Sequence, residues 1–331
     1  GYSFVYAVFD DGTDIYWARS RVLEYMQGLT ESLPPGVTPS LGPDATGVGW
    51  GFQYALVDKS GKHDLAELRS FQDWHLRYWI QSVEDVAEVA TYGGFQKQYQ
   101  IDIDPNKLLA YGIPITKIFS AVRAANNDVG GRELERFGTT YLIRGHGYIK
   151  SLENLRLVVV GADAKGTPVL LRDVARKIEL GPEMRRGAGE LNGEGETVGG
   201  IVVVRFGQNV LQVIESIKAK LEEVKPSLPP GVEIVTTYDR SDLINRSIQT
   251  LTRTIIEESI IVSIIVIVFL LDFGGALRAI ITLPVAVALA FIPMYYMGLT
   301  ANIMSLAGIA IAIGAICDEA VVMVENVHKH L

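Results

Sequence analysis

The sequence is poor in cysteine and has no excess of basic charge. Cys317 is the only cysteine among 331 residues, which excludes an internal disulfide framework and any zinc site built from several cysteines. The formal net charge is −8, and an acidic chain argues against a nucleic-acid partner, whose phosphates attract clustered lysine and arginine. The first residues also lack the initiating methionine and the basic and apolar regions of a signal peptide.

Charge is missing from long runs near the C-terminus. None of the residues 259–271 or 279–317 is charged. A bilayer-spanning helix needs about 20 mostly apolar residues. We predict three membrane helices, at about 250–271, 277–297 and 303–325. The positive-inside rule then places Arg278 and Lys329 in the cytoplasm and residues 1–240 in the periplasm of a bacterium. Since no signal peptide precedes this exported part, we interpret the chain as a fragment cut at both ends.

A short internal repeat indicates two related modules. The sequence Ser-Leu-Pro-Pro-Gly-Val occurs at 32–37 and again at 227–232. In each copy the proline pair ends a predicted helix, and the glycine supplies the turn into a strand. The two predicted helices cover about 14–32 and 208–225, and the predicted strands around them are Phe4–Phe9, a strand from Val37, Gly200–Phe206 and Glu233–Thr237. Between the copies we predict strands at Gly51–Val57 and Tyr99–Ile103, helices from Asp64 to about Ser82 and at about 115–126, and a hairpin turn at Asn192-Gly193. Two β-α-β units with matching turns favour duplicated ferredoxin-like modules.

Asp318 is the main candidate for chemistry. It lies about fifteen residues into the third predicted membrane helix, where an ionisable side chain is costly and by default functional. Burial favours the protonated carboxyl, so Asp318 is suited to take up and release a proton near neutral pH. At about 100° per residue, Met304, Ile311 and Glu325 lie on the same stripe, and Glu325 is a second proton-relay candidate. The alternative is a helix that reaches cytoplasmic water at Asp318, and we assign the neighbouring Glu319 a solvated or paired role.

Three soft sulfur ligands lie on the same predicted helix. Met304, Cys317 and Met323 carry the thioether and thiol groups that suit Cu(I) and similar ions. Met304 and Met323 are about 28 Å apart along a helix, so they can act only as separate stations completed by other helices. The alternative is that the methionines fill gaps in a core and that Cys317 is a small buried apolar residue.

One segment carries a specific resemblance. Residues 302–329 read NIMSLAGIAIAIGAICDEAVVMVENVHK. This stretch resembles the fourth membrane helix of resistance-nodulation-division efflux pumps, and within them the heavy-metal branch and its copper/silver pumps of the Cus type. Supporting stretches are LGPDATGVGW at 41–50, GPEMRRG at 181–187, ELNGEGE at 190–196 and TTYDRS at 236–241.

The resemblance implies a secondary transporter rather than an enzyme. It implies proton-driven export of Cu(I) or Ag(I), with no cofactor, by a homotrimer in the bacterial inner membrane. A periplasmic adaptor and an outer-membrane channel are the implied partners. The implied fold is an α+β membrane protein with ferredoxin-like periplasmic porter modules, a β-rich docking insertion and three transmembrane helices. The implied divisions are part of the first porter module at 1–48, the second porter module at 49–97 and 184–240, the docking insertion at 98–183 and the transmembrane helices at 241–331.

The resemblance also assigns residue roles. Asp318 corresponds to the proton-relay aspartate of these pumps, and Met304 and Met323 correspond to positions of a methionine relay. Ile316 replaces the middle methionine of that relay, so the metal path is interrupted unless the adjacent Cys317 substitutes as a soft ligand. Glu319 stands where the copper/silver pumps usually carry a small residue.

Four other functions are alternatives to this interpretation. A divalent-cation exporter for zinc, cobalt or nickel belongs to the same branch, and a drug exporter belongs to the same superfamily. An intramembrane aspartyl protease needs two aspartates within the membrane helices, and only Asp318 qualifies. A module that docks an adaptor without transporting anything is the fourth.

Overall fold

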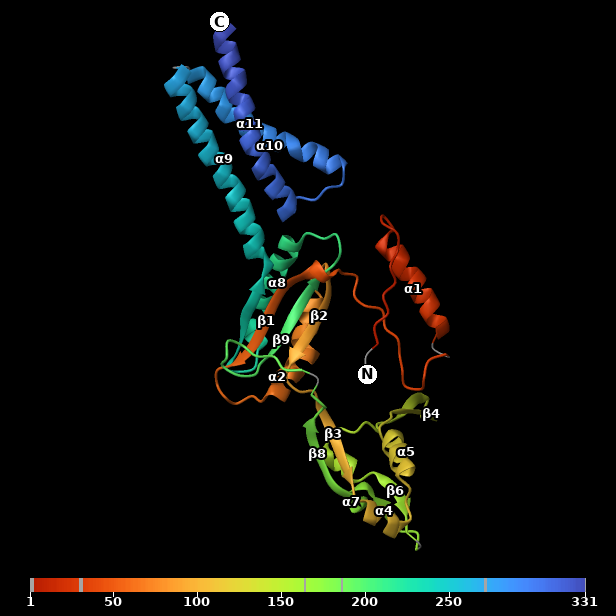
Figure 1. The fold of residues 1–331 in the computed structure, drawn as a ribbon. Helices are drawn as coiled ribbons and strands as arrows, with labels where there is room; N and C mark the ends of the chain where they lie inside the picture. Colours follow the sequence, from red (N-terminus) through yellow and green to blue (C-terminus); the bar gives the residue numbers. More distant parts are fainter. Residues whose placement is uncertain (1–2, 30–31, 164, 186, 271–272, 331) are drawn as a thin grey trace.

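The computed structural model describes residues 3–29, 32–163, 165–185, 187–270 and 273–330. Beyond an N-terminal helix, the described residues form a four-stranded sheet with helices, an insertion that extends from that sheet, and a group of long helices (Figure 1). The chain is therefore a mixed α/β structure. The insertion and the long helices lie at opposite ends of the sheet (Figure 1).

The N-terminal part contains one of the elements predicted for the first repeat. Helix α1 (Ile15–Leu29) lies within the predicted helix, and the Asp14 carboxylate accepts a hydrogen bond from the Trp17 N–H at 2.7 Å. The predicted strands at Phe4–Phe9 and from Val37 are wrong, because no strand occurs among the described residues before position 50. A strand is stabilised by hydrogen bonds to a neighbouring strand, and nothing in the described chain pairs with either segment. The apolar pattern of these segments was therefore not sufficient to predict strands.

The central sheet consists of four antiparallel strands in the order β10-β1-β9-β2. These are β1 (Trp50–Asp58), β2 (Val86–Gly93), β9 (Val198–Val204) and β10 (Val232–Asp239). The first, third and fourth correspond to predicted strands, whereas β2 was not predicted. Two β-α-β units interleave in this order, because β1 lies between β9 and β10 while β9 lies between β1 and β2.

Helices from both units pack on one face of this sheet (Figure 1). They are α2 (Leu65–Phe71), α3 (Arg77–Gln81) and α8 (Val210–Val224). The helix predicted from Asp64 to about Ser82 is confirmed, with a π-helical turn (Gln72–Leu76) between α2 and α3. Asp64 and Asn209 cap α2 and α8 through side-chain oxygens that accept backbone N–H groups. The buried side chains between sheet and helices include Phe52, Leu56, Leu76, Ile80, Val202, Ile214 and Ile217.

One polar pair lies inside this apolar core. The Tyr54 hydroxyl donates a hydrogen bond of 3.0 Å to the Gln72 Oε1 atom, and both side chains are fully buried. Burial raises the pKa of Tyr54 well above its usual value. Gly200 on the adjacent strand makes room for the ring, because a Cβ atom there would lie 2.4 Å from the Tyr54 hydroxyl oxygen. The π-helical turn therefore begins at the residue that satisfies the buried tyrosine.

The insertion between β2 and β9 has its own apolar core and contains both strands and helices. Its strands are β3 (Lys97–Ile103), β4 (Val129–Arg136), β5 (Thr139–Gly145), β6 (Val159–Ala162), β7 (Pro168–Leu170) and β8 (Ala175–Pro182). Its helices are α4 (Pro105–Tyr111), α5 (Ile115–Ala125), α6 (Leu152–Arg156) and α7 (Leu171–Val174). The strands pair two by two, as β3 with β8, β4 with β5 and β6 with β7. Short separate ladders, rather than one large sheet, hold the insertion together.

The C-terminal part consists of α9 (Arg240–Leu270), α10 (Phe273–Tyr296) and α11 (Ile303–His330). Helices therefore occupy all three predicted ranges. Side chains from all three pack together, namely Leu251 and Val262 of α9, Val287 of α10, and Leu306 and Ile313 of α11. Judged on length and hydropathy over the described residues, no single helix meets the requirements for crossing a bilayer, and the bent pair α4 and α5 is the one combination that does.

Candidate functional site on helix α11

Helix α11 begins at a cap formed by two side chains. The Asn302 Oδ1 atom accepts the Ser305 N–H at 3.0 Å, and the Ser305 hydroxyl oxygen accepts the Asn302 N–H at 2.9 Å. This reciprocal arrangement satisfies backbone donors that a helix N-terminus leaves free. The cap therefore sets where α11 starts.

Opposite faces of α11 have different surroundings. Leu306 and Ile313, seven residues apart, are buried against α9 and α10. Met304 and Ile311, also seven residues apart, have exposed fractions of 81% and 80%. Asp318 continues this second stripe and is exposed as well. The candidate proton-relay carboxyl therefore lies on the face of α11 that points away from its packed side.

The two acidic candidates have different partners. Glu325 forms an ion pair of 2.9 Å with Lys329, one helical turn further along α11, and both side chains are largely exposed. Such an exposed pair contributes little stability in water. The Asp318 side chain is exposed within the described chain, so its enclosure in a larger bundle stays a prediction. The structure places the two carboxyls on one stripe, as the helical period predicts.

The sulfur ligands are not brought together. Met304 is 81% exposed and Met323 is 65% exposed, and about 28 Å of helix separates them. The side chain of Cys317 lies outside the described residues. Across the part of the chain that the structure describes, no cluster of three histidine, cysteine, aspartate or glutamate side chains is arranged to hold a metal ion. Any site that uses these methionines must be completed by other groups.

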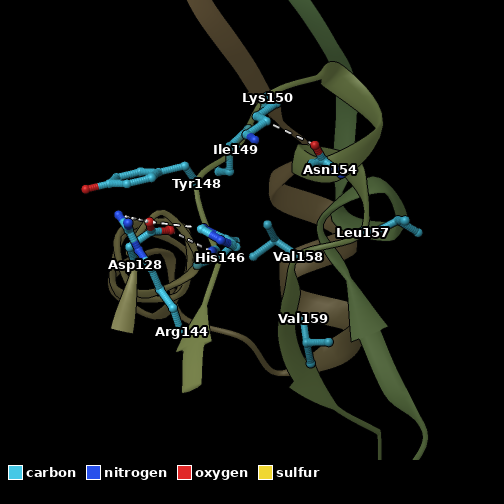
Figure 2. A pocket seen from close by; sticks show the side chains of 12 residues that line it. Asp128, Arg144, His146, Tyr148, Ile149, Lys150, Asn154, Leu157, Val158 and Val159 are labelled. Atoms are coloured by element: carbon cyan, nitrogen blue, oxygen red, sulfur yellow. Dashed lines mark hydrogen bonds and ion pairs between the residues drawn. The ribbon is translucent and has the colours of Figure 1, made fainter. Parts of the chain in front are cut away.

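A cavity of about 720 Å³ lies in the insertion, at the base of the β4–β5 hairpin (Figure 2). The Asp128 carboxylate there accepts hydrogen bonds from the Gly147 N–H at 3.0 Å and from Arg144 at 3.1 Å. The His146 Nδ1 atom lies 3.4 Å from the same carboxylate. These contacts, led by the Gly147 N–H, hold the pKa of Asp128 below its usual range.

The Asp128 cluster was not predicted from the sequence, in which His146 looked isolated. Asp128 precedes β4 while Arg144 and His146 lie at the end of β5, so only the hairpin pairing brings them together. With its carboxylate already engaged by these groups, Asp128 ties the two ends of the hairpin. The cluster therefore fixes the hairpin rather than offering a free ligand.

The interleaved β-α-β units, the inserted domain and the α11 sequence together define the class of this chain. A family model described as the AcrB/AcrD/AcrF family matches residues 1–331, and the chain belongs to that family. The resemblance found in the sequence is thereby confirmed.

The similar proteins include cation efflux system proteins and a heavy metal efflux pump of known structure. The chain is 55% identical over its full length to "Cation efflux system protein CusA" of Escherichia coli K12 and 53% identical to "Putative cation efflux system protein SilA" of Salmonella typhimurium. The chain spans 32% of the length of each. A crystal structure of a heavy metal efflux pump superposes with a TM-score of 0.83 at 31% identity, covering 98% of this chain and 32% of that one.

Proposed function

We propose that this chain is part of a proton-driven exporter of the monovalent metal ions Cu(I) and Ag(I). The observation that carries the proposal is the difference in identity between relatives. Over its whole length the chain is 55% identical to CusA and 53% identical to SilA, but 35% identical to "Cobalt-zinc-cadmium resistance protein CzcA" of Cupriavidus metallidurans. The CzcA match favours a divalent-cation exporter as the second candidate.

The finer architecture is proposed on the same basis. The sheet order β10-β1-β9-β2 supports a ferredoxin-like porter module, and the inserted domain supports a docking role. The uncharged run 279–317 supports the membrane location of α10 and α11. Exposed aliphatic side chains on α9 and α10, such as Ile260, Ile264 and Leu289, also support contact with lipid or other membrane helices. In this arrangement the full protein is a trimer, and residues 1–240 lie in the periplasm. The trimer binds a periplasmic adaptor and an outer-membrane channel.

The role proposed for Asp318 follows from its place on α11. Its stripe faces away from α9 and α10, so the remaining helices of the full protein would enclose the carboxyl. An ionisable carboxyl enclosed in a membrane bundle is costly and is typical of a proton relay. Uptake of protons from the periplasmic side and their release to the cytoplasm would then drive export of the metal substrate.

Replacement of Asp318 in the full-length pump tests this role. We expect Asp318→Asn to abolish copper and silver resistance, because the amide cannot ionise, while the protein still inserts and assembles. Glu319→Gln is the matched control, since it removes the adjacent carboxyl from a different face of α11 and should preserve resistance. Full resistance with Asp318→Asn would refute the relay role. Protection against zinc but not copper by the wild-type gene would favour the divalent-cation exporter instead.

A further inference from the structure

The junction between the central sheet and α9 contains a charged cluster that was not predicted. Asp239 is the last residue of β10 and Arg240 is the first residue of α9, so no loop separates the strand from the helix. Elements joined without a loop still bend at the connecting residues unless other contacts hold the angle between them. The angle between the sheet and α9 therefore depends on what surrounds Asp239.

Lys218 of α8 provides that contact. Its Nζ atom forms an ion pair with the Asp239 carboxylate and donates a hydrogen bond of 3.0 Å to the Ser241 hydroxyl. Ser241 in turn donates from its N–H at 2.9 Å and from its hydroxyl at 2.6 Å to the Asp239 Oδ1 atom. The three side chains belong to a strand and two helices, so the cluster ties α9 to α8 as well as to β10.

The cluster is sheltered from water on its acidic side. The Asp239 side chain is 11% exposed, and Ser241 is 3% exposed. Partial burial works to raise the pKa of Asp239, but hydrogen bonds from Lys218 and Ser241 outweigh it and hold the pKa below its usual range. The Lys218 side chain is 44% exposed, so the carboxylate is the sheltered end of the ion pair. Loss of Lys218 would leave this carboxylate without its cationic partner.

A continuous path of packed elements leads from this junction to Asp318. Helix α9 runs without a break from Arg240 to Leu270, and its residues Leu251 and Val262 pack in one cluster with Leu306 and Ile313 of α11. Asp318 lies five residues beyond Ile313 on α11. A rotation of α11 against α9 therefore reaches the sheet through the junction at Asp239 and through the neighbouring contacts of α9, which include a hydrogen bond from Arg240 to the Val48 carbonyl oxygen.

We propose that Lys218, Asp239 and Ser241 form a rigid joint that transmits movement between α9 and the central sheet, with Lys218 as a positioning residue for transport. This inference rests on the proposed export function. It predicts that a loosened joint uncouples proton passage from metal export. Protons then still pass through the membrane helices, but fewer metal ions are exported for each proton.

The test uses the full-length pump in proteoliposomes, with Ag⁺ as the substrate. Ag⁺ transport and Ag⁺-dependent proton flux are measured for Lys218→Met, Lys218→Arg and Ser241→Ala. We expect Lys218→Met to lower Ag⁺ transport about tenfold, the factor that corresponds to loss of about 1.4 kcal/mol of coupling. Proton flux should fall less, so the number of protons per Ag⁺ ion rises. Lys218→Arg should restore most of the coupling, since it keeps the charge, and Ser241→Ala should give a smaller shift in the same direction.

Lys220→Met is the matched control, because Lys220 is also on α8 but pairs with Glu223 of the same helix at 2.8 Å. It should leave the proton-to-silver ratio unchanged. If the number of protons per Ag⁺ ion equals the wild-type value in both Lys218→Met and Ser241→Ala, the inference is overturned, whether or not total Ag⁺ transport falls. Failure of the proposed function gives a different result. In that case vesicles with the wild-type pump do not transport Ag⁺, or vesicles with Asp318→Asn transport it as fast as the wild type.

Discussion

The buried pair of Tyr54 and Gln72 allows a quantitative test of the central core. Both side chains are fully buried, and the tyrosine hydroxyl donates to the amide oxygen at 3.0 Å. Tyr54→Phe leaves the amide oxygen without this donor, and Gln72→Met leaves the hydroxyl without this acceptor. Each single change should destabilise the core by about 1–3 kcal/mol, because a buried polar group then loses its partner.

The double variant should be less unstable than the two single changes imply together. With both polar groups removed, no unsatisfied donor or acceptor from this pair remains in the core, and the interaction energy should be about 1–2 kcal/mol. Hydrogen–deuterium exchange of the full-length pump, followed on peptides that cover β1 and the π-helical turn, measures these differences. Single variants should exchange about five- to 150-fold faster in that region. Strictly additive effects would show that the pair is not energetically coupled and would refute the reasoning.

Two further predictions concern single positions. The hydrogen bond from the Ser60 hydroxyl, together with that from the His63 N–H, lowers the pKa of Asp58 to about 2. The stability that these bonds contribute should therefore be complete above about pH 4 and decline as the pH falls towards 2. Asp58→Asn should flatten this pH dependence in thermal unfolding of the full chain. Gly200→Ala should cost about 1–3 kcal/mol through the clash with Tyr54, whereas Gly28→Ala, which meets no atom within 4 Å, should not reduce stability; equal exchange rates in the two variants would contradict this.

Local patterns in the sequence were enough for most helices and for several strands. The turn at Asn192 and Gly193 illustrates this, since both residues adopt the positive φ angles of 55° and 76° that this dipeptide favours in a hairpin. Helix α5 and strand β3 likewise fall where their own residues predict them. Where the pattern lacked a partner, as in the apolar segment Phe4–Phe9, the prediction was wrong, because a strand depends on another segment of the chain.

The sequence by itself determined the family of this protein, the stripe that carries Met304, Ile311 and Asp318, and the start of the helix on which they lie. These follow from contiguous residues and from the fixed rotation of a helix. Only the tertiary structure decided which face of α11 is covered and which ion pairs form, because packing sets the contacts between residues that are distant in the chain. Lys218 and Asp239 come into contact only when α8 packs on the sheet that contains β10, and no local sequence pattern predicts that contact.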